Sequence, residues 1–433
     1  MPPKNGSESA PPEKHETDSV GKAVVPVPSL LSVDEALQRI LDMAEPVGSE
    51  TVSLAHADGR ALRDPVIARR TQPPFDASAM DGYAVRAVEA NLGSRLLVMG
   101  EIPAGAMPGH GIGHKEAMRI FTGAPMPVGA DAILLQEDAA PDVSRKGALE
   151  RLLGVTVRAG VVQGDWVRPA GGDFHEGDVL IDVPRRLRPQ DIGLAAAAGV
   201  PWLTVARKPR VALIATGDEL KLPGEPTEPS EIASSNNFSV AALLARYGAE
   251  PVILPIAHDD VGALRAAIRE ARGADLIVTL GGASVGDHDF SRRAFEEEGM
   301  SPDFYKIAMR PGKPLMAGHL GDALVVGLPG NPVSAFVCAH VFLRPALDAL
   351  LGLPAEQLMR RPVPLAIDLP PGGPREHYMR AALERREVGP VVRPEANQDS
   401  SLMSILAQAD VLAVRPAHDR ARQAGEMLDC IDL

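Results

Sequence analysis

The pattern of hydrophobic and polar positions first becomes regular at Ser32. Ser32 and Glu35 have the spacing of a capping box, in which each side chain satisfies a backbone N–H at the start of a helix. Pro46 cannot continue a helix, so the helix must end before it. Between these points the apolar residues recur at helical intervals, at Val33, Ala36, Leu37, Ile40, Leu41 and Ala44.

The next stretch, from about residue 51 to residue 158, predicts mostly β structure. It is dense in glycine and proline and carries short apolar runs such as LLVMG and DAILLQ. Its segment VSRKGALERLLGV is ambiguous, and a hairpin with a long loop is one interpretation. Farther on, RPQDIGLAAAAGV predicts a short helix that stops at Gly199. Because residues 159–206 do not easily form a compact domain alone, we expect them to pack with the helix at Ser32.

From Arg210 onward, continuous apolar runs alternate with helical patterns. The runs are VALIAT, PVILPI, DLIVTL and ALVVGLPG, and one intervening helix is expected from Asn236 to Tyr247. This alternation predicts a doubly wound parallel α/β sheet, which binds ligands at the carboxyl ends of its strands. GDEL, HDD, GGASVGDHD and GLPGNPVS all stand at those ends. After Pro354 the pattern becomes β again.

These patterns divide the chain into five parts. We expect a disordered tail at residues 1–28 and a discontinuous first domain at 29–50 and 159–206. A β-rich second domain follows at 51–158, then an α/β domain at 207–353 and a small C-terminal β domain at 354–433. The tail is rich in proline, serine and glutamate and lacks the apolar surface needed for order.

Composition narrows the function. The net charge of −13 argues against wholesale binding to nucleic acid or anionic membranes, and 3% aromatic residues argue against stacking of single strands. The chain shows no signal-peptide pattern and no apolar run of the length a membrane span needs, so we expect a cytoplasmic protein. The two cysteines, Cys338 and Cys430, form no zinc or redox motif, and Cys338 is expected to be a buried thiol.

The candidate chemistry lies at the predicted strand ends. The sequence has neither a P-loop nor a dinucleotide-binding fingerprint. Asp218, Asp287 and Asp289 are candidate Mg²⁺ ligands, because hard cations prefer oxygen, although any one of them could be a helix cap. Lys306, Arg310 and Lys313 could neutralise a phosphate or another oxyanion, and Ser284 and Ser334 could donate hydrogen bonds to it. Glycines let a backbone approach such a ligand closely.

Two stretches of the β-rich region add polar residues. PPFDASAMDGYAV contains Asp76, Ser78 and Asp81, and RIFTGAPMPVGADAI contains Thr122 after an apolar strand. Alone, each stretch would be interpreted as a loop with polar caps.

Six motifs together resemble one family. PFDASAMDGYAV, TGAPMPVGAD, ATGDEL, GGASVGDHD, RPGKP and GLPGNPVSA occur here in the order found in the MoeA family, which includes the C-terminal domain of gephyrin. The resemblance implies a molybdopterin molybdenumtransferase, which inserts molybdenum from molybdate into adenylylated molybdopterin and releases AMP. It also implies Mg²⁺ and an elongated homodimer of four-domain chains. The third domain would be MogA-like, similar in fold to molybdopterin adenylyltransferases, and the first would serve dimerisation.

The resemblance also implies a site shared between two chains. The second domain of one chain would contribute Asp76 and Thr122 to a cleft in the third domain of its partner. Arg375 in PREHYMR and Ser400 in NQDSS would face molybdate. The third domain would contribute Asp218, Gly281, Gly282, Ser284, Gly286, Asp287, Asp289, Lys306, Arg310, Pro311, Gly312, Lys313, Pro329, Gly330, Asn331 and Ser334.

Three positions depart from the family pattern. Arg310 stands where many members have lysine, Ser234 where many have aspartate, and Gly172 where some bacterial members have glutamate. These departures affect the expected metal shell. Two alternatives stay open, a molybdopterin adenylyltransferase and a non-catalytic scaffold of the same fold. Expected partners are a second copy, small-molecule substrates, molybdopterin adenylyltransferase and molybdoenzyme maturation factors.

Overall fold

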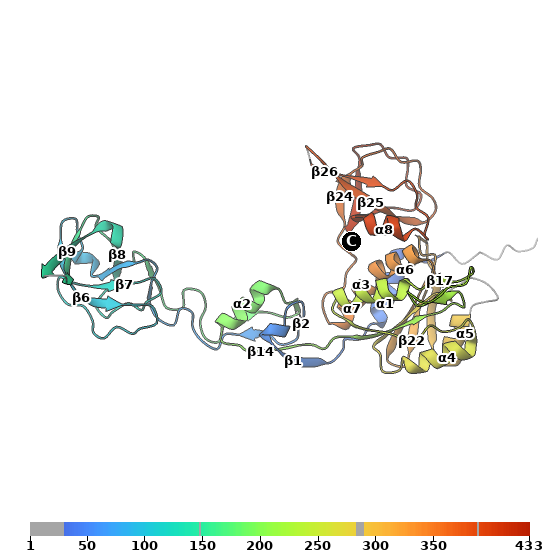
Figure 1. Ribbon diagram of the computed structural model, residues 1–433, viewed down its shortest axis with the longest axis horizontal. Coiled ribbons are helices and arrows are strands. Elements are labelled where there is room, and N and C mark those ends of the chain that lie inside the picture. The colour runs from blue at the N-terminus through green and yellow to red at the C-terminus, as the bar shows by residue number, and fades with distance from the viewer. Residues whose placement is uncertain (1–29, 147–148, 283–289, 388) are drawn as a thin grey trace, which may run out of the picture.

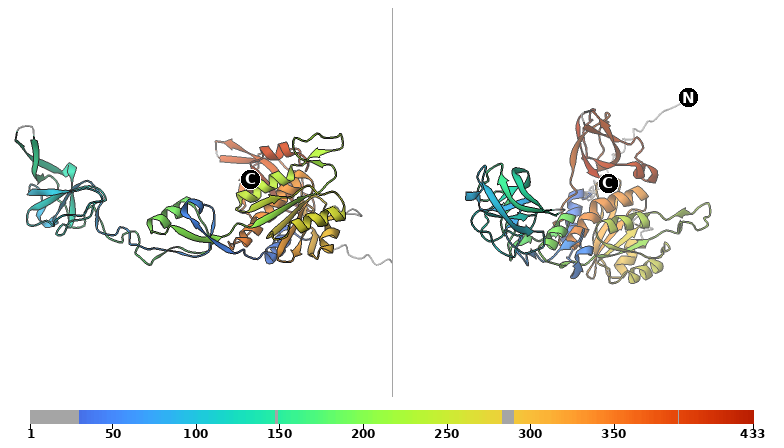
Figure 2. Two further views of the ribbon diagram at one scale, coloured as in Figure 1. Left: turned by 60° about the horizontal axis from the view of Figure 1, so that its bottom comes forward. Right: turned by 60° about the vertical axis from the view of Figure 1, so that its left-hand side comes forward.

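The computed structural model describes residues 30–146, 149–282, 290–387 and 389–433. The molecule is elongated, with a β-rich lobe at one end and an α/β domain at the other (Figure 1). A small middle domain lies between them, and a C-terminal domain packs on the α/β domain. The left view of Figure 2 shows the same separation of the lobe from the α/β domain.

The β-rich lobe is built on a six-stranded sheet with strand order β8-β5-β7-β6-β10-β9. The ambiguous segment is a hairpin in which β9 and β10 pair antiparallel, and only two residues separate these strands, so the long loop is wrong. The short strands β4 (Ala77–Ser78) and β11 (Val167–Arg168) pair at its base. The six strands are β5 (Gly82–Val85), β6 (Arg95–Ile102), β7 (Glu116–Ile120), β8 (Ala132–Leu135), β9 (Ala139–Lys146) and β10 (Leu149–Val157).

The middle domain combines two distant stretches of chain. Its sheet has the order β1-β14-β2-β13, and helix α2 (Pro189–Ala197) packs on it, followed by Gly199 in the left-handed region as predicted. Residues 49–67 therefore pair with residues 179–206, and the boundary expected at residue 51 cuts through this pairing. The strands are β1 (Ser49–Ser53), β2 (Ala61–Leu62), β3 (Val66–Ile67), β12 (Val179–Ile181), β13 (Arg185–Arg186) and β14 (Trp202–Ala206).

The α/β domain contains a six-stranded sheet in the order β18-β15-β19-β23-β22-β20. The first four strands are parallel, as predicted. β22 runs antiparallel to both of its neighbours, β23 and β20. Only Gly321 and Asp322 connect β22 to β23, and so short a turn can join only antiparallel strands. The strands are β15 (Arg210–Ala215), β18 (Glu250–Ile253), β19 (Leu276–Leu280), β20 (Ser301–Lys306), β22 (Pro314–Leu320) and β23 (Ala323–Leu328).

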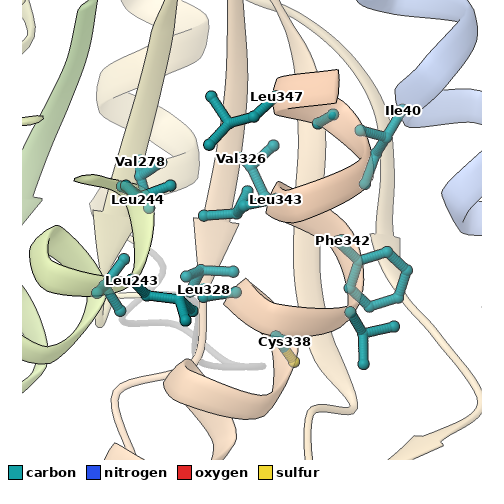
Figure 3. Close-up of a cluster of buried hydrophobic side chains, with 14 of the residues drawn as sticks. Ile40, Leu243, Leu244, Val278, Val326, Leu328, Cys338, Phe342, Leu343 and Leu347 are labelled. Atoms are coloured by element: carbon teal, nitrogen blue, oxygen red, sulfur yellow. The ribbon is translucent and has the colours of Figure 1, made fainter. Parts of the chain in front are cut away.

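Helices cover both faces of this sheet. Along β15, Val211 and Leu213 face one core, whereas Ala212 and Ile214 face the other. Helices α4 (Val261–Glu270) and α5 (Phe290–Glu297) cover the second face. Figure 3 shows side chains of the first core, including Leu243, Val326 and Phe342. That face is covered by α1 (Val33–Met43), α3 (Asn236–Arg246), α6 (Pro332–Cys338) and α7 (Arg344–Leu350).

Helix α1 has the predicted capping box, with Ser32 Oγ accepting from Glu35 N at 3.2 Å and Glu35 Oε2 accepting from Ser32 N at 2.9 Å. Its apolar face is buried in the α/β core and not against residues 159–206, so that packing expectation is wrong. The aliphatic stripe of α1, which includes Ile40, packs against α7 and β22, and these elements belong to a larger apolar core than that of the middle domain.

The stretch from Pro332 to Leu350 is a continuous helix with a π-helical segment at Ala339–Leu343. Its length and composition would suit a membrane span, which differs from the sequence-based expectation. However, 78% of its most apolar window is buried inside the protein, so it is the core helix of the α/β domain. Cys338 lies within it, fully buried as predicted, and burial raises the pKa of its thiol.

The C-terminal domain is a β-sheet with strand order β21-β25-β27-β28-β24, and β26 pairs with β25. Its edge strand β21 (Met309–Arg310) belongs to the loop that precedes β22, so the sheet extends across both domains. Helix α8 (Met403–Gln408) lies between the domains (Figure 1). The remaining strands are β24 (Arg361–Pro364), β25 (Glu376–Arg386), β26 (Gly389–Pro394), β27 (Val411–Arg415) and β28 (Met427–Asp432).

Candidate functional site

A cavity of about 770 Å³ opens at the carboxyl ends of β15, β19 and β23. The short strands β16 (Leu220–Lys221) and β17 (Ile232–Ala233) form one wall, and the N-terminus of α6 forms another. Six predicted site residues line it: Gly281, Gly282, Pro329, Gly330, Asn331 and Ser334. Ser284, Gly286, Asp287 and Asp289 lie outside the described residues.

The backbone conformation and the close packing at this cavity require glycine at two positions. Gly281 and Gly282 have φ values of 103° and 67°, in the left-handed region that favours glycine. A Cβ at Gly282 would lie 2.0 Å from Ser291 Oγ, and a Cβ at Gly281 would lie 2.8 Å from the carbonyl oxygen of Thr216. Any larger residue would therefore displace the loop, and the bare backbone faces the cavity.

Three hydroxyl groups at this loop have no hydrogen-bond partner among the described residues. Thr216 Oγ1, Thr279 Oγ1 and Ser291 Oγ are buried, and within the described chain nothing accepts from or donates to them. Leaving such a group unsatisfied costs roughly 1–3 kcal/mol each. Of the three, Thr216 lines the cavity. Sequence reasoning missed all three. A hydroxyl residue that ends or interrupts a buried apolar strand, as in VALIAT and DLIVTL, is the signal that could have found Thr216 and Thr279.

Asp218 lies at the edge of the cavity beside His258. Its Oδ1 is 2.8 Å from His258 Nδ1 and accepts a hydrogen bond from the backbone N–H of Asp259 at 3.3 Å. The His258 hydrogen bond, and then that backbone bond, lower the pKa of Asp218. Within residues 30–282 and the later described segments, no three His, Cys, Asp or Glu side chains gather as a metal-binding group.

The predicted cations lie beside the cavity. Lys306, Arg310 and Lys313 are exposed, and no carboxylate in the described segments forms an ion pair with them. Pro314, which follows Lys313, is the member of this segment that reaches the cavity wall.

Gly312 within RPGKP is fixed by packing. Its φ is 113°, and an added Cβ would lie 2.4 Å from the sulfur of Cys338. The preceding peptide, between Arg310 and Pro311, is cis. The loop that carries Lys313 is therefore seated directly on the core helix.

The C-terminal domain adds positive charge next to this loop. Arg375 donates from Nη1 to the carbonyl oxygen of Met309 at 3.2 Å. Burial, followed by the charges of Arg310, Arg415, Arg380 and Arg375, lowers the pKa of His377 to about 4. Of these arginines, Arg380 and Arg415 are buried, whereas Arg375 is the one that contacts the loop.

Ser400 joins the C-terminal domain to the cavity. Its Oγ accepts a hydrogen bond from Asn331 Nδ2 at 2.9 Å, and its carbonyl accepts from Val333 N at 3.0 Å. The loop containing it wraps around the buried Arg380, which donates to the carbonyls of Asp399 and Leu402. The NQDSS segment therefore docks against the start of α6.

A second polar cluster lies in the β-rich lobe. Asp81 Oδ1 accepts from both the backbone N–H and the hydroxyl of Thr122, each at 2.8 Å, and these bonds lower the pKa of Asp81. Asp76 Oδ1 accepts from the backbone N–H of Ala170 at 2.8 Å. Nearby, Arg119 lies over the rings of Tyr83 and Phe121, at 5.0 and 5.1 Å.

The structure does not bring the two clusters together within one chain. Asp76 precedes β4 and Thr122 follows β7, and both strands belong to the lobe, which the middle domain separates from the α/β domain (Figure 1). Each cluster on its own therefore contains only some of the predicted site residues.

Three family models together match most of the described chain. Residues 31–199 match the MoeA N-terminal region (domain I and II), residues 212–349 match a probable molybdopterin binding domain, and residues 362–433 match the MoeA C-terminal region (domain IV). The molybdopterin molybdenumtransferase of Bacillus subtilis is 32% identical, over 93% of this chain and 94% of that protein. This chain belongs to the MoeA family.

Other relatives agree with this assignment. Molybdopterin molybdenumtransferase 2 of Mycobacterium tuberculosis is 36% identical, over 82% of this chain and 88% of that protein. A solved structure of the molybdopterin biosynthesis MoeA protein from Pyrococcus horikoshii is 28% identical, covers 93% of this chain and 99% of that chain, and superposes with a TM-score of 0.77. The predicted family and fold class are confirmed.

Two departures from the family pattern now have a structural setting. Ser234, where many MoeA members have aspartate, is buried, donates from Oγ to Asn237 Oδ1 at 3.0 Å and lines the cavity. Gly172 lies in a turn, with its N–H donating to the carbonyl of Pro169, at the base of the lobe. Ser234 thus contributes a hydroxyl to the cavity wall in place of a carboxylate.

Proposed function

We propose that this chain is a molybdopterin molybdenumtransferase that takes adenylylated molybdopterin and molybdate as substrates and releases AMP. The observation that carries the proposal is the cavity at the sheet's carboxyl end, built from the residues of the family motifs. Its volume of about 770 Å³ suits a nucleotide-sized ligand. The exposed backbone of Gly281 and Gly282 suits the approach of phosphate groups.

The cations beside the cavity give molybdate a place to bind. Molybdate is a tetrahedral dianion, and charge-assisted hydrogen bonds from Lys313, Arg310 and Arg375 would hold it next to the pterin. Lys306 would add to the positive potential. The dithiolene sulfurs of the substrate are soft ligands for molybdenum, so no cysteine of the protein is needed. This agrees with the burial of Cys338 and Cys430.

We propose Mg²⁺ as the cofactor. Asp218 would be one of its ligands, and Asp287 and Asp289, which lie outside the described residues, would be the others. Carboxylate oxygen is the ligand type that Mg²⁺ prefers, and Asp218 offers it, but in the described segments no three such side chains gather around it, so the site would be completed by Asp287 and Asp289. Bound there, Mg²⁺ would neutralise charge on the phosphoanhydride. His258 would orient Asp218 through its ring nitrogen.

A homodimer is the second part of the proposal. The lobe cluster and the cavity lie at opposite ends of an elongated chain, which supports a site that uses both clusters only when two chains combine. In a twofold dimer, Asp76 and Thr122 of one protomer would face the cavity of the other, and two equal sites would result. A cytoplasmic location and contacts with molybdopterin adenylyltransferase and molybdoenzyme maturation factors belong to the same proposal.

The decisive experiment measures AMP release from adenylylated molybdopterin with and without molybdate. We expect release only when molybdate is present. Formation of the adenylate from ATP and molybdopterin would instead identify a molybdopterin adenylyltransferase. Binding of the substrate without AMP release under either condition would identify a non-catalytic scaffold.

A further inference from the structure

A second cavity lies between the middle domain and the α/β domain. Its volume is about 540 Å³, within the range of small-ligand pockets. The middle domain contributes the segment from His56 to Arg60 together with Arg186. The α/β domain contributes the end of α3 and the start of α7, which lies on the side facing the middle domain (Figure 1). We call this cavity the junction cleft.

The junction cleft is strongly basic. Five cations line it, namely Arg60, Arg186, Lys208, Arg246 and Arg344, against two carboxylates, Asp58 and Asp348. The chain as a whole carries a net charge of −13, so this concentration is local. Like charges gathered in one concavity repel one another and raise the local concentration of anions.

Two of the cations already form ion pairs and hydrogen bonds within the protein. Arg186 donates to Asp348 Oδ1 at 2.6 Å and to the carbonyl of Gly59 at 2.9 Å, so it bridges the two domains. Arg60 pairs with Glu50 and donates to the carbonyl of Ala206 at 2.7 Å. These contacts fix one wall of the cleft before any ligand binds.

The other three cations form no ion pair with a carboxylate in the part of the chain that the structure describes. Lys208 and Arg246 are exposed to the cleft, and Arg344 lies over the ring of Tyr247 at 5.3 Å. A guanidinium stacked in this way keeps its edge N–H groups available for an oxyanion.

The aromatic side of the cleft is rigid. Tyr247 Oη lies 2.5 Å from His340 Nδ1, and His340 Nε2 lies 3.1 Å from the carbonyl of Asp432. An imidazole that donates from Nε2 to this carbonyl accepts the tyrosine proton at Nδ1. This hydrogen bond fixes the Tyr247 ring, and because Arg344 lies over that ring, it also positions Arg344.

We propose that the junction cleft binds a small phosphate anion that carries two or three linked phosphoryl groups. Lys208, Arg246 and Arg344 would contact the phosphoryl oxygens, and Arg186 would hold the domains on either side. The bound anion would therefore brace the middle domain against the α/β domain. This site is separate from the cavity at the sheet's carboxyl end and does not depend on the function proposed above.

Calorimetric titration of the full chain with inorganic pyrophosphate tests the proposal. Four variants are compared with the wild type: Lys208→Gln with Arg246→Gln together, Arg246→Gln alone, Lys313→Gln beside the other cavity, and Arg385→Gln as an exposed cation elsewhere. We expect about tenfold weaker binding for each cleft cation removed, and unchanged cleft binding in Lys313→Gln and Arg385→Gln. Titration with ATP and with adenosine distinguishes a nucleotide from inorganic phosphate as the source.

Several outcomes would overturn the site. These are an absence of saturable binding, equal weakening by Arg385→Gln, or loss of all binding in Lys313→Gln. Circular dichroism checks that each variant folds. If the double variant does not fold, Arg246→Gln alone carries the test, because Arg246 is exposed at the end of α3 and its substitution leaves the core intact.

Discussion

The polar cluster of the β-rich lobe and the cavity of the α/β domain are built in opposite ways. In the lobe, Oδ1 of Asp76 accepts a hydrogen bond from Ala170 and Oδ1 of Asp81 accepts two from Thr122. At and beneath the cavity, the hydroxyls of Thr216, Thr279 and Ser291 have no partner in the described chain, and Thr216 is the one that lines the cavity. The lobe carboxylates each have a hydrogen-bond partner, whereas the three hydroxyls have none among the described residues.

This difference assigns the two regions different tasks. A satisfied carboxylate is held in one position and can present a fixed surface to a ligand that arrives from elsewhere. An unsatisfied buried hydroxyl gains a hydrogen bond only when a ligand or water supplies it. We therefore expect the α/β cavity to provide most of the substrate-binding energy and the lobe to orient the bound substrate.

The largest expected effect follows from removing a cation beside the cavity. Lys313→Ala should reduce molybdate-dependent AMP release by at least about a hundredfold, because it removes a charged donor from the oxyanion. The fold should persist, since Lys313 is exposed and pairs with no carboxylate of the described chain. Arg385→Ala, which removes an exposed cation from β25, is the matched control and should leave turnover unchanged. Equal activity of Lys313→Ala and wild type would remove this residue from the site.

A smaller effect is expected from the backbone of the cavity. Gly282→Ala should lower activity about tenfold, because its Cβ would collide with Ser291 Oγ and shift the loop. The control is Gly273→Ala in the same domain, where φ is 86° but no atom lies within 4 Å of the added Cβ. Both variants carry the left-handed strain of roughly 1–2 kcal/mol. Chemical unfolding measures that shared cost, and the difference in activity reports the collision alone.

The sequence predicted the regular elements well, because their signals are local. Helix α1 follows from its capping box and apolar stripe, and α2 from its terminal glycine. The parallel strands follow from continuous apolar runs. Their carboxyl ends carry the predicted glycines, which line the cavity, and the functional roles of these residues stay a prediction.

The remaining features depend on contacts between distant segments. The partner of α1 could not be predicted, because an apolar stripe does not specify which core it joins. The pairing of residues 49–67 with residues 179–206 joins short strands of two to five residues, which leave little periodicity. Thr216 and Thr279 were missed because threonine is β-branched and fits a strand pattern as well as an aliphatic residue does.

Mixed dimers test whether the two regions meet across chains. Asp76→Ala and Lys313→Ala should each be inactive as homodimers. In a mixed dimer one site collects both defects and the other is intact, and random mixing makes about half of the dimers mixed, so about a quarter of wild-type activity should return.

A tag on one chain must show that subunits exchange when the two variants are refolded together. Restoration would place the lobe of one protomer at the cavity of its partner. No restoration despite proven exchange would contradict the shared site, because every site would then carry one defect.

The smallest expected effect distinguishes two buried threonine hydroxyls, which have the same chemistry but lie at different positions relative to the cavity. Thr216 lines the cavity, whereas Thr279 is fully buried beneath it, packed near Gly327. Replacing either with valine keeps the shape and removes an unpartnered hydroxyl, so both variants should gain roughly 1 kcal/mol in the free energy of unfolding. Only Thr216→Val should also raise KM for adenylylated molybdopterin, by about fivefold, because only its hydroxyl is within reach of a bound ligand. A matching rise in Thr279→Val would mean that the change acts through the shape of the core, whereas an unchanged KM in both would leave the Thr216 hydroxyl without a role in binding.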